Sequence, residues 1–125
     1  MTQPNDLSSQ GAANLPELLV RLENDRDLLS ELINVFKEEF PPLMQSLRQA
    51  VAGGELKNVE SASHALKGML FGLAVTRGAV QASRIEQMAR EGTAAAGLAN
   101  ALALLENEVA NLLPELNTYI ATATP

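Results

Sequence analysis

Apolar residues recur along most of this chain at intervals of three and four positions, which is the spacing of one face of an α-helix. No segment alternates between apolar and polar residues with a period of two, so the sequence predicts no β-strand. The pattern instead predicts a short helix that carries Leu15, Leu18, Leu19 and Leu22 and stops at Asn24, followed by four long helices. The expected core positions of the long helices are, in chain order, Leu29, Leu32, Phe36, Leu43, Leu47 and Val51; Leu56, Val59, Ala62, Leu66, Met69 or Leu70, and Leu73; Ala82, Ile85, Met88 and Ala89; and Leu98, Leu102, Leu105, Val109, Leu112, Leu116 and Tyr119 or Ile120.

Polar caps and glycines mark the ends of the long helices. Asn24 or Asp25 can cap the first one, and the pair Gly53 and Gly54 ends it. The second covers residues 55–73. Threonines stand at the expected caps of the third and fourth helices, which are Thr76 and Thr93.

Prolines interrupt two of these helices. Pro42 lacks an amide donor and Pro41 disfavours helical geometry at Phe40, so we expect a kink or a brief break in the first long helix. Pro114 predicts a kink in the last helix.

Short connections force consecutive helices to pack side by side, so the predicted fold is all-α. We expect an antiparallel up-down four-helix bundle, with the short extra N-terminal helix lying over one end. The predicted bundle domain spans residues 14–121. Residues 1–13 are small and polar and are expected to form a flexible N-terminal tail.

Composition narrows the chemistry that this domain can carry. The chain has 125 residues, no Cys and one His, which excludes disulfides, a thiol nucleophile and a multi-histidine metal site. Its formal charge of -6 argues against nucleic acid as a partner. It has no apolar run of the ~20 residues that span a bilayer and no signal-peptide pattern at its start, so we expect a soluble cytoplasmic protein without membrane contact.

The single histidine lies on the exposed face of the second long helix. At about 100° per residue, His64 points away from the core positions Ala62 and Leu66. Gly68 follows four residues later on the same face, with Lys67 beside it. A glycine inside a helix costs about 1 kcal/mol relative to alanine, so either a partner approaches the backbone closely here or the helix tolerates a local weakness.

The segment HALKGMLFGLAV at residues 64–75 resembles the phosphohistidine motif of histidine-containing phosphotransfer (HPt) domains of bacterial phosphorelays. The similarity covers residues 14–120, because the helix order and loop placement also follow that family. The resemblance implies a phosphohistidine intermediate that relays a phosphoryl group between receiver-domain aspartates. It also implies a phosphocarrier rather than an enzyme, and the chain has no P-loop or kinase signature.

Residue roles follow from the resemblance, position by position. His64 would be phosphorylated on Nε2, Lys67 would stabilise the phosphoryl oxygens, and Gly68 would leave room for the receiver. Glu86 falls where the family often places a polar residue against the imidazole, with Arg90 one turn later, near the phosphate. An exposed ion pair between Glu86 and Arg90 is the alternative interpretation of these two residues.

The chain departs from the family just after the histidine. Where the family favours small residues and, after the next leucine, a glycine, this chain has Met69, Leu70, Phe71 and Ala74. Phe71 shares the face of His64, so it is either a partner contact or turns inward at a bend near Gly72.

The resemblance also implies the partners, which are receiver domains of response regulators or of hybrid histidine kinases. We expect a monomer with no cofactor or metal of its own, since the receiver supplies Mg²⁺. The alternative function is a helical adaptor that docks on a receiver or kinase without being phosphorylated. A carboxylate metal bundle would need inward-facing Glu-x-x-His ligands, whereas His64 points outward.

Overall fold

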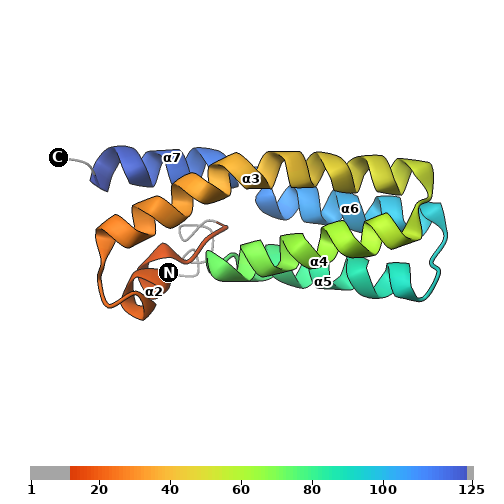
Figure 1. Ribbon diagram of the computed structural model, residues 1–125, viewed down its shortest axis with the longest axis horizontal. Coiled ribbons are helices and arrows are strands. Elements are labelled where there is room, and N and C mark those ends of the chain that lie inside the picture. The colour runs from red at the N-terminus through yellow and green to blue at the C-terminus, as the bar shows by residue number, and fades with distance from the viewer. Residues whose placement is uncertain (1–11, 124–125) are drawn as a thin grey trace, which may run out of the picture.

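The computed structural model describes residues 12–123, and within this range the chain is helical, with no strand (Figure 1). The all-α prediction is confirmed. The helices are α2 (Leu15–Arg21), α3 (Arg26–Gly53), α4 (Leu56–Gly72), α5 (Thr76–Arg90), α6 (Ala95–Val109) and α7 (Leu112–Ala123).

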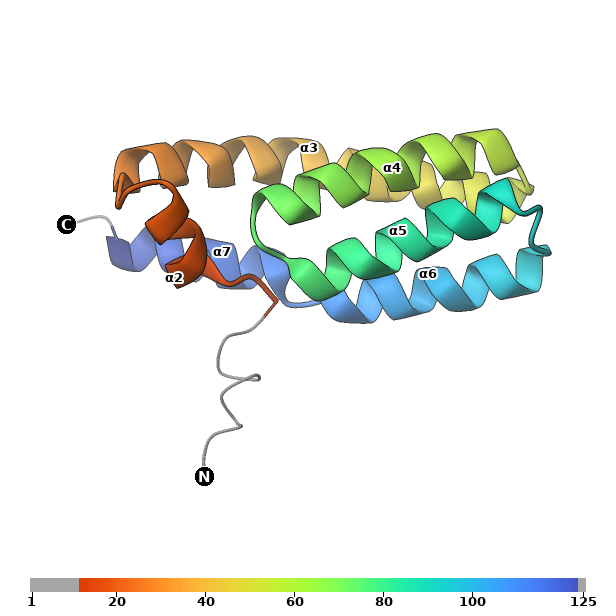
Figure 2. The same cartoon turned by 90° about the horizontal axis from the view of Figure 1, so that it is seen from below.

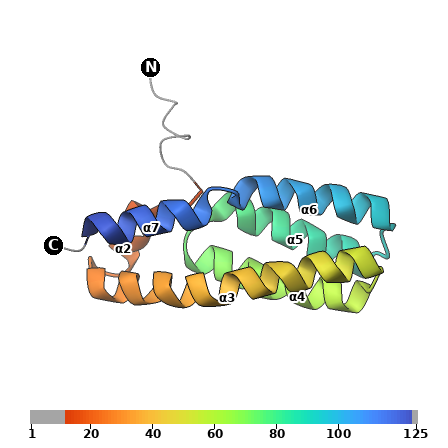
Figure 3. The same ribbon diagram turned by 90° about the horizontal axis from the view of Figure 1, so that it is seen from above.

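Helices α3 to α6 form the predicted antiparallel four-helix bundle. Each packs against the next, and α6 also packs against α3, which closes the ring (Figures 1 and 2). Helix α7 continues beyond α6 along the N-terminal half of α3, and the short α2 lies across that same end (Figures 2 and 3). Leucine, isoleucine and alanine side chains from all four bundle helices fill the core. Within the described range, no helix is long and apolar enough to cross a membrane.

The last predicted helix is in fact two helices, so the prediction of one helix with a kink is wrong. Helix α6 ends at Val109 and α7 begins at Leu112, three residues after it. Pro114 has no N–H to donate to the carbonyl of Ala110, which stops the helix from continuing. The same proline fits the first turn of α7, where no intrahelical donor is required.

The two prolines of α3 bend the helix without ending it. Pro41 and Pro42 lie inside a continuous helix, and both are exposed, so water can reach the carbonyl groups left without a donor. Figures 1 and 3 show α3 changing direction partway along. Of the two outcomes expected for this helix, a kink or a brief break, the kink is confirmed.

The predicted caps are confirmed for α3 and are wrong for α5 and α6. Asp25 accepts a hydrogen bond from the Leu28 amide at 3.0 Å, and Gly54 ends α3 with a φ of 67°. The N-caps of α5 and α6 are Val75 and Ala94, and neither makes a side-chain cap hydrogen bond. Thr76 is already the first residue of its helix.

The predicted N-terminal tail overlaps the described residues only at Ala12 and Ala13, and both contact the bundle. Their amides donate to the Glu115 carboxylate at 2.9 and 3.3 Å, and Ala13 is buried. The next amide, that of Asn14, donates to the Ala74 carbonyl at 3.0 Å. These bonds fix the segment before α2 to the body of the bundle. The rest of the predicted tail, residues 1–11, lies outside the described residues.

The core positions follow the predicted stripes with two shifts in α3. Met44 is buried where Leu43, which is only partly buried, was expected, and the second shift affects the surface. Ile33 is buried in place of Leu32, which is exposed together with Leu28 and Val35. In α4, the buried alternative is Leu70 rather than Met69. One end of α3 therefore keeps apolar side chains at the surface.

Candidate functional site

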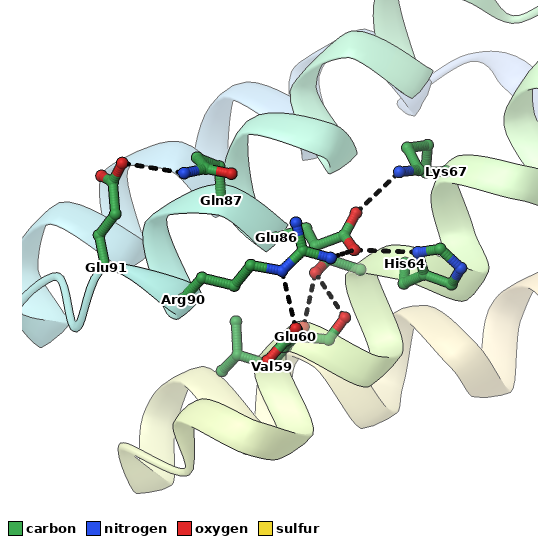
Figure 4. Close-up of polar contacts among 9 residues, drawn as sticks. Val59, Glu60, His64, Lys67, Glu86, Gln87, Arg90 and Glu91 are labelled. Carbon is green, nitrogen blue, oxygen red and sulfur yellow. Dashed lines mark hydrogen bonds and ion pairs between the residues drawn. The ribbon is translucent and has the colours of Figure 1, made fainter.

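His64 lies in the middle of α4 with 67% of its side chain exposed. Its Nδ1 atom is 2.9 Å from Oε2 of Glu86, which comes from the neighbouring helix α5 (Figure 4). Figure 4 shows the other ring nitrogen on the side of the imidazole that is turned away from Glu86. The histidine is therefore held at one nitrogen and presented to solvent at the other.

Glu86 is a buried carboxylate, only 3% of whose side chain is exposed. Oε1 accepts from Lys67 Nζ at 2.9 Å, while Oε2 faces the imidazole and also accepts from Arg90 Nη2 at 2.5 Å. The interpretation of Glu86 as part of an exposed pair is wrong, although its ion pair with Arg90 is present. Burial without such partners would be costly, because a carboxylate loses its hydration.

The protonation of Glu86 determines which nitrogen of His64 carries the hydrogen. Burial by itself would raise the pKa of the Glu86 carboxyl. Hydrogen bonds from Lys67 and His64 and the charges of Arg90 and Lys67 outweigh that effect, so this pKa lies below its ordinary value of 4.5. An ionised carboxylate can only accept, so the contact with His64 requires a proton on Nδ1. In the neutral ring, Nε2 then carries the free lone pair.

Arg90 is bound between two carboxylates. Its Nε donates to Oε2 of Glu60 at 2.8 Å, and its Nη2 donates to Oε2 of Glu86 (Figure 4). Glu60 precedes His64 by four residues on α4 and therefore lies on the same face of that helix. Glu60 is not among the site residues predicted from the sequence, although its spacing from His64 was a signal that could have identified it.

Among residues 12–123, Gly68 has no neighbour that would exclude a side chain. A Cβ atom built on Gly68 would meet nothing within 4 Å. The contrast is Gly78 on α5, where a Cβ would lie 3.2 Å from a methyl group of Val109. Packing inside the molecule thus accounts for Gly78 and does not account for Gly68.

Phe71 is exposed, so the alternative in which it turns inward is wrong. Its side chain lies at the surface, with the residue 48% exposed, and α4 ends one residue later at Gly72. A groove of about 190 Å³ lies between this end of α4 and the neighbouring helix α3. We call it the α3–α4 groove, and its lining residues are Leu32, Val35, Phe36, Glu39, Met69, Gly72 and Leu73. The groove was not predicted from the sequence, because the helical pattern assigned Leu32 to the core.

The structure brings His64, Lys67, Glu86 and Arg90 into one contact network that joins α4 to α5. Gly68 and Phe71 also lie on α4 but are not part of this network. Among residues 12–123, no group of three or more His, Cys, Asp or Glu side chains is placed to hold a metal ion.

The fold and the site define a class of protein, a helical bundle whose one histidine is exposed on its outer face and oriented by a buried carboxylate. The sequence matches the family model described as the Hpt domain over residues 31–118. This match covers more than half of the chain, which therefore belongs to the Hpt domain family. Comparisons with curated proteins and with solved structures found no match. Hpt domains are phosphocarriers of two-component systems and interact with receiver domains.

Proposed function

We propose that this protein carries a phosphoryl group on Nε2 of His64, between the aspartates of two receiver domains. The observation that carries the proposal is the exposed imidazole whose Nδ1 donates to a buried carboxylate. This arrangement directs the lone pair of Nε2 toward an approaching partner.

The transfer of the phosphoryl group forms one bond and breaks one bond, and it consumes no further reactant. The Nε2 lone pair attacks the phosphorus of the receiver's aspartyl phosphate, the N–P bond forms, and the P–O bond breaks with its electron pair left on the aspartate carboxylate. Nδ1 keeps its proton, so the phosphorylated ring carries a positive charge that Glu86 balances at 2.9 Å. The reverse attack by a second aspartate returns the electron pair to Nε2.

Lys67 supports the same step from one turn along α4. Its ammonium group contacts Glu86 in the unphosphorylated protein, with 28% of the side chain exposed. A phosphoryl group on His64 offers a second anionic partner on the same face of the helix. We expect Lys67 to stabilise the phosphoryl oxygens, and the receiver to bring the Mg²⁺ ion that the transfer needs.

Docking of the receiver would use the part of α4 that follows His64. Gly68 allows close approach of the partner's backbone, because none of the described residues fills the space above it. Phe71 and the α3–α4 groove add apolar surface beside it, as expected for a contact centred on an aromatic anchor.

The test is phosphotransfer from purified, phosphorylated receivers of the source organism. We expect at least one of them to label the wild type on His64 with an acid-labile, alkali-stable bond. His64→Gln is expected to abolish the label while leaving the helix content unchanged, since the side chain is exposed. A label that persists in this variant would disprove the proposal. Receivers that bind without transferring phosphate would favour the adaptor alternative.

A further inference from the structure

A row of three charged side chains leads to Nδ1 of His64, the ring nitrogen that contacts Glu86. Glu60 on α4 binds Arg90, Arg90 binds Glu86, and Glu86 faces Nδ1 of the imidazole (Figure 4). Only the last contact touches the histidine. The first two form an ion-pair chain that runs from α4 to α5, and the third contact returns from α5 to the same face of α4.

The atoms that Arg90 uses identify what it acts upon. The oxygen that accepts from its Nη2 is Oε2 of Glu86, the same oxygen that lies 2.9 Å from Nδ1 of His64. Its Nε is bound to the Glu60 carboxylate at 2.8 Å. Both contacts direct the guanidinium at carboxylates on the Nδ1 side of the ring, whereas a phosphoryl group would be attached to Nε2.

Glu60 limits the positions that Arg90 can occupy. Half of the Arg90 side chain is exposed, and a long exposed side chain samples many rotamers unless a partner holds it. The planar guanidinium matches two acceptors at once, so Glu60 from the facing helix and Glu86 from its own helix together fix its plane. Without Glu60, only the contact within α5 would hold Arg90.

We propose that Arg90 and Glu60 are positioning residues, which act through Glu86 to keep His64 in the tautomer protonated on Nδ1. Arg90 then acts on the imidazole and does not bind the phosphoryl group. This inference rests on the proposed function for its catalytic meaning, but the tautomer itself can be measured without any receiver.

The experiment is ¹⁵N NMR of the His64 side chain in the full chain, at a pH where the ring is neutral. The protein has one histidine, so the two ring nitrogens give an unambiguous pair of signals. The variants are Glu60→Gln, Arg90→Gln and the double variant, with thermal melts to verify folding. Arg90→Lys keeps the charge without the planar fork and serves as a second variant if Arg90→Gln unfolds.

A matched control pair lies elsewhere in the bundle. Arg48 on α3 donates from Nε to Glu106 on α6, and their side chains are 46% and 38% exposed, against 50% and 39% for Arg90 and Glu60. Arg48→Gln and Glu106→Gln therefore remove a similar ion pair between helices that does not reach His64.

We expect wild type and both control variants to show the proton on Nδ1. Arg90→Gln should shift the population toward the Nε2-protonated form and slow phosphotransfer. Glu60→Gln should do the same to a smaller extent, about twofold to fivefold in the transfer rate, as for an exposed ion pair. Because Glu60 acts through Arg90, it should have no added effect in the double variant.

Two results would overturn the inference. One is slower transfer in Arg90→Gln with an unchanged tautomer, which would make Arg90 a phosphate ligand. The other is an effect of Glu60→Gln that is equally large with and without Arg90. If no receiver phosphorylates His64, the proposed function fails, whereas the tautomer measurement still supports or refutes the positioning role.

Discussion

The two flanks of His64 differ in chemistry although α4 contributes to both. The ionic flank consists of Glu60, Lys67, Glu86 and Arg90, whose contacts reach Nδ1 of the imidazole. The apolar flank consists of Gly68, Phe71 and the α3–α4 groove, toward the C-terminal end of α4. One flank prepares the reacting nitrogen, and the other offers surface to a partner. Variants on the ionic flank should therefore change the chemistry, and variants on the apolar flank should change docking.

Glu86→Gln is expected to have the largest effect of a single substitution around His64. It preserves the shape of the side chain but removes the charge that orients the imidazole and pairs with Lys67 and Arg90. We expect the transfer rate at saturating receiver to fall about tenfold to a hundredfold, by analogy with the loss of a residue that orients a metal-ligating histidine. Rapid-quench transfer measurements test this, with Glu108→Gln as the control because Glu108 pairs with Arg77 away from His64. An unchanged rate would mean that the ionic flank is structural only.

The same carboxylate should make stability depend on pH. The pKa of Glu86 is lower in the folded protein than its ordinary value of 4.5, so its contribution to stability is fully present above that value. As the pH falls below 4.5, the unfolded chain takes up the proton first and the contribution is progressively lost. Urea denaturation of wild type and Glu86→Gln should thus give unfolding free energies whose difference narrows in this range. If the difference in unfolding free energy between wild type and Glu86→Gln did not change with pH, the predicted contribution of the Glu86 carboxylate would be contradicted.

Phe71→Ala should weaken docking without affecting the fold. Removing an aromatic anchor costs about 1 to 3 kcal/mol of binding free energy, whereas a half-exposed ring contributes little to the core. Receiver titrations should show the weaker affinity, with the rate at saturation and the melting temperature nearly unchanged. Leu104→Ala on α6 is the matched control, since Leu104 is 45% exposed and Phe71 48%. Equal affinity in wild type and Phe71→Ala would leave the apolar flank without a role in docking.

Local sequence signals predicted the architecture and the residue at the centre of the site. Helical spacing and the two glycines at the C-terminal end of α3 were sufficient for the bundle, because each signal depends on neighbours only a few positions apart. The broken last helix was missed, since a proline pattern alone does not distinguish a kink from a new helix start. The exposure of Leu32 was missed because helical phase leaves neighbouring positions nearly equivalent until the packing of α4 against α3 selects one.

The charge network required tertiary structure. Sequence spacing placed Arg90 one turn from Glu86, but the burial of Glu86 and the arrival of Glu60 depend on how α4 and α5 face each other. Glu60 lies 30 positions before Arg90, a separation that no local pattern connects. Family resemblance indicated a polar residue near the imidazole, and the structure adds the atom that it contacts.

Two substitutions at Gly68 should separate helix stability from receiver access. Both Gly68→Ala and Gly68→Gln should stabilise the fold by about 0.5 to 1 kcal/mol, because a Cβ meets none of the described residues within 4 Å and both residues favour helix more than glycine does. Only the long glutamine side chain should impair transfer, by obstructing the close approach of the receiver. Thermal melts and transfer assays of the two variants measure this contrast. Unimpaired transfer in Gly68→Gln would show that the glycine is incidental.

The smallest expected effect is that of Ala74→Gly, at the turn that ends the apolar flank. Ala74 has a φ of 59°, and a left-handed conformation costs a residue with a side chain about 1 to 2 kcal/mol. Relief of that strain opposes two losses, which are about 0.8 kcal/mol for the buried methyl group and about 0.4 to 1 kcal/mol for the greater freedom of glycine in the unfolded chain. The gain and the two losses nearly cancel, so we expect the unfolding free energy of Ala74→Gly to change by less than about 0.5 kcal/mol. The control Ala103→Gly, in the interior of α6, should lose about 1 kcal/mol of unfolding free energy.

Both variants should transfer phosphate normally, because neither residue belongs to a flank of His64. Equal losses of stability in the two variants would show that the turn stores no strain, and slower transfer in Ala74→Gly alone would extend the docking surface beyond the end of α4.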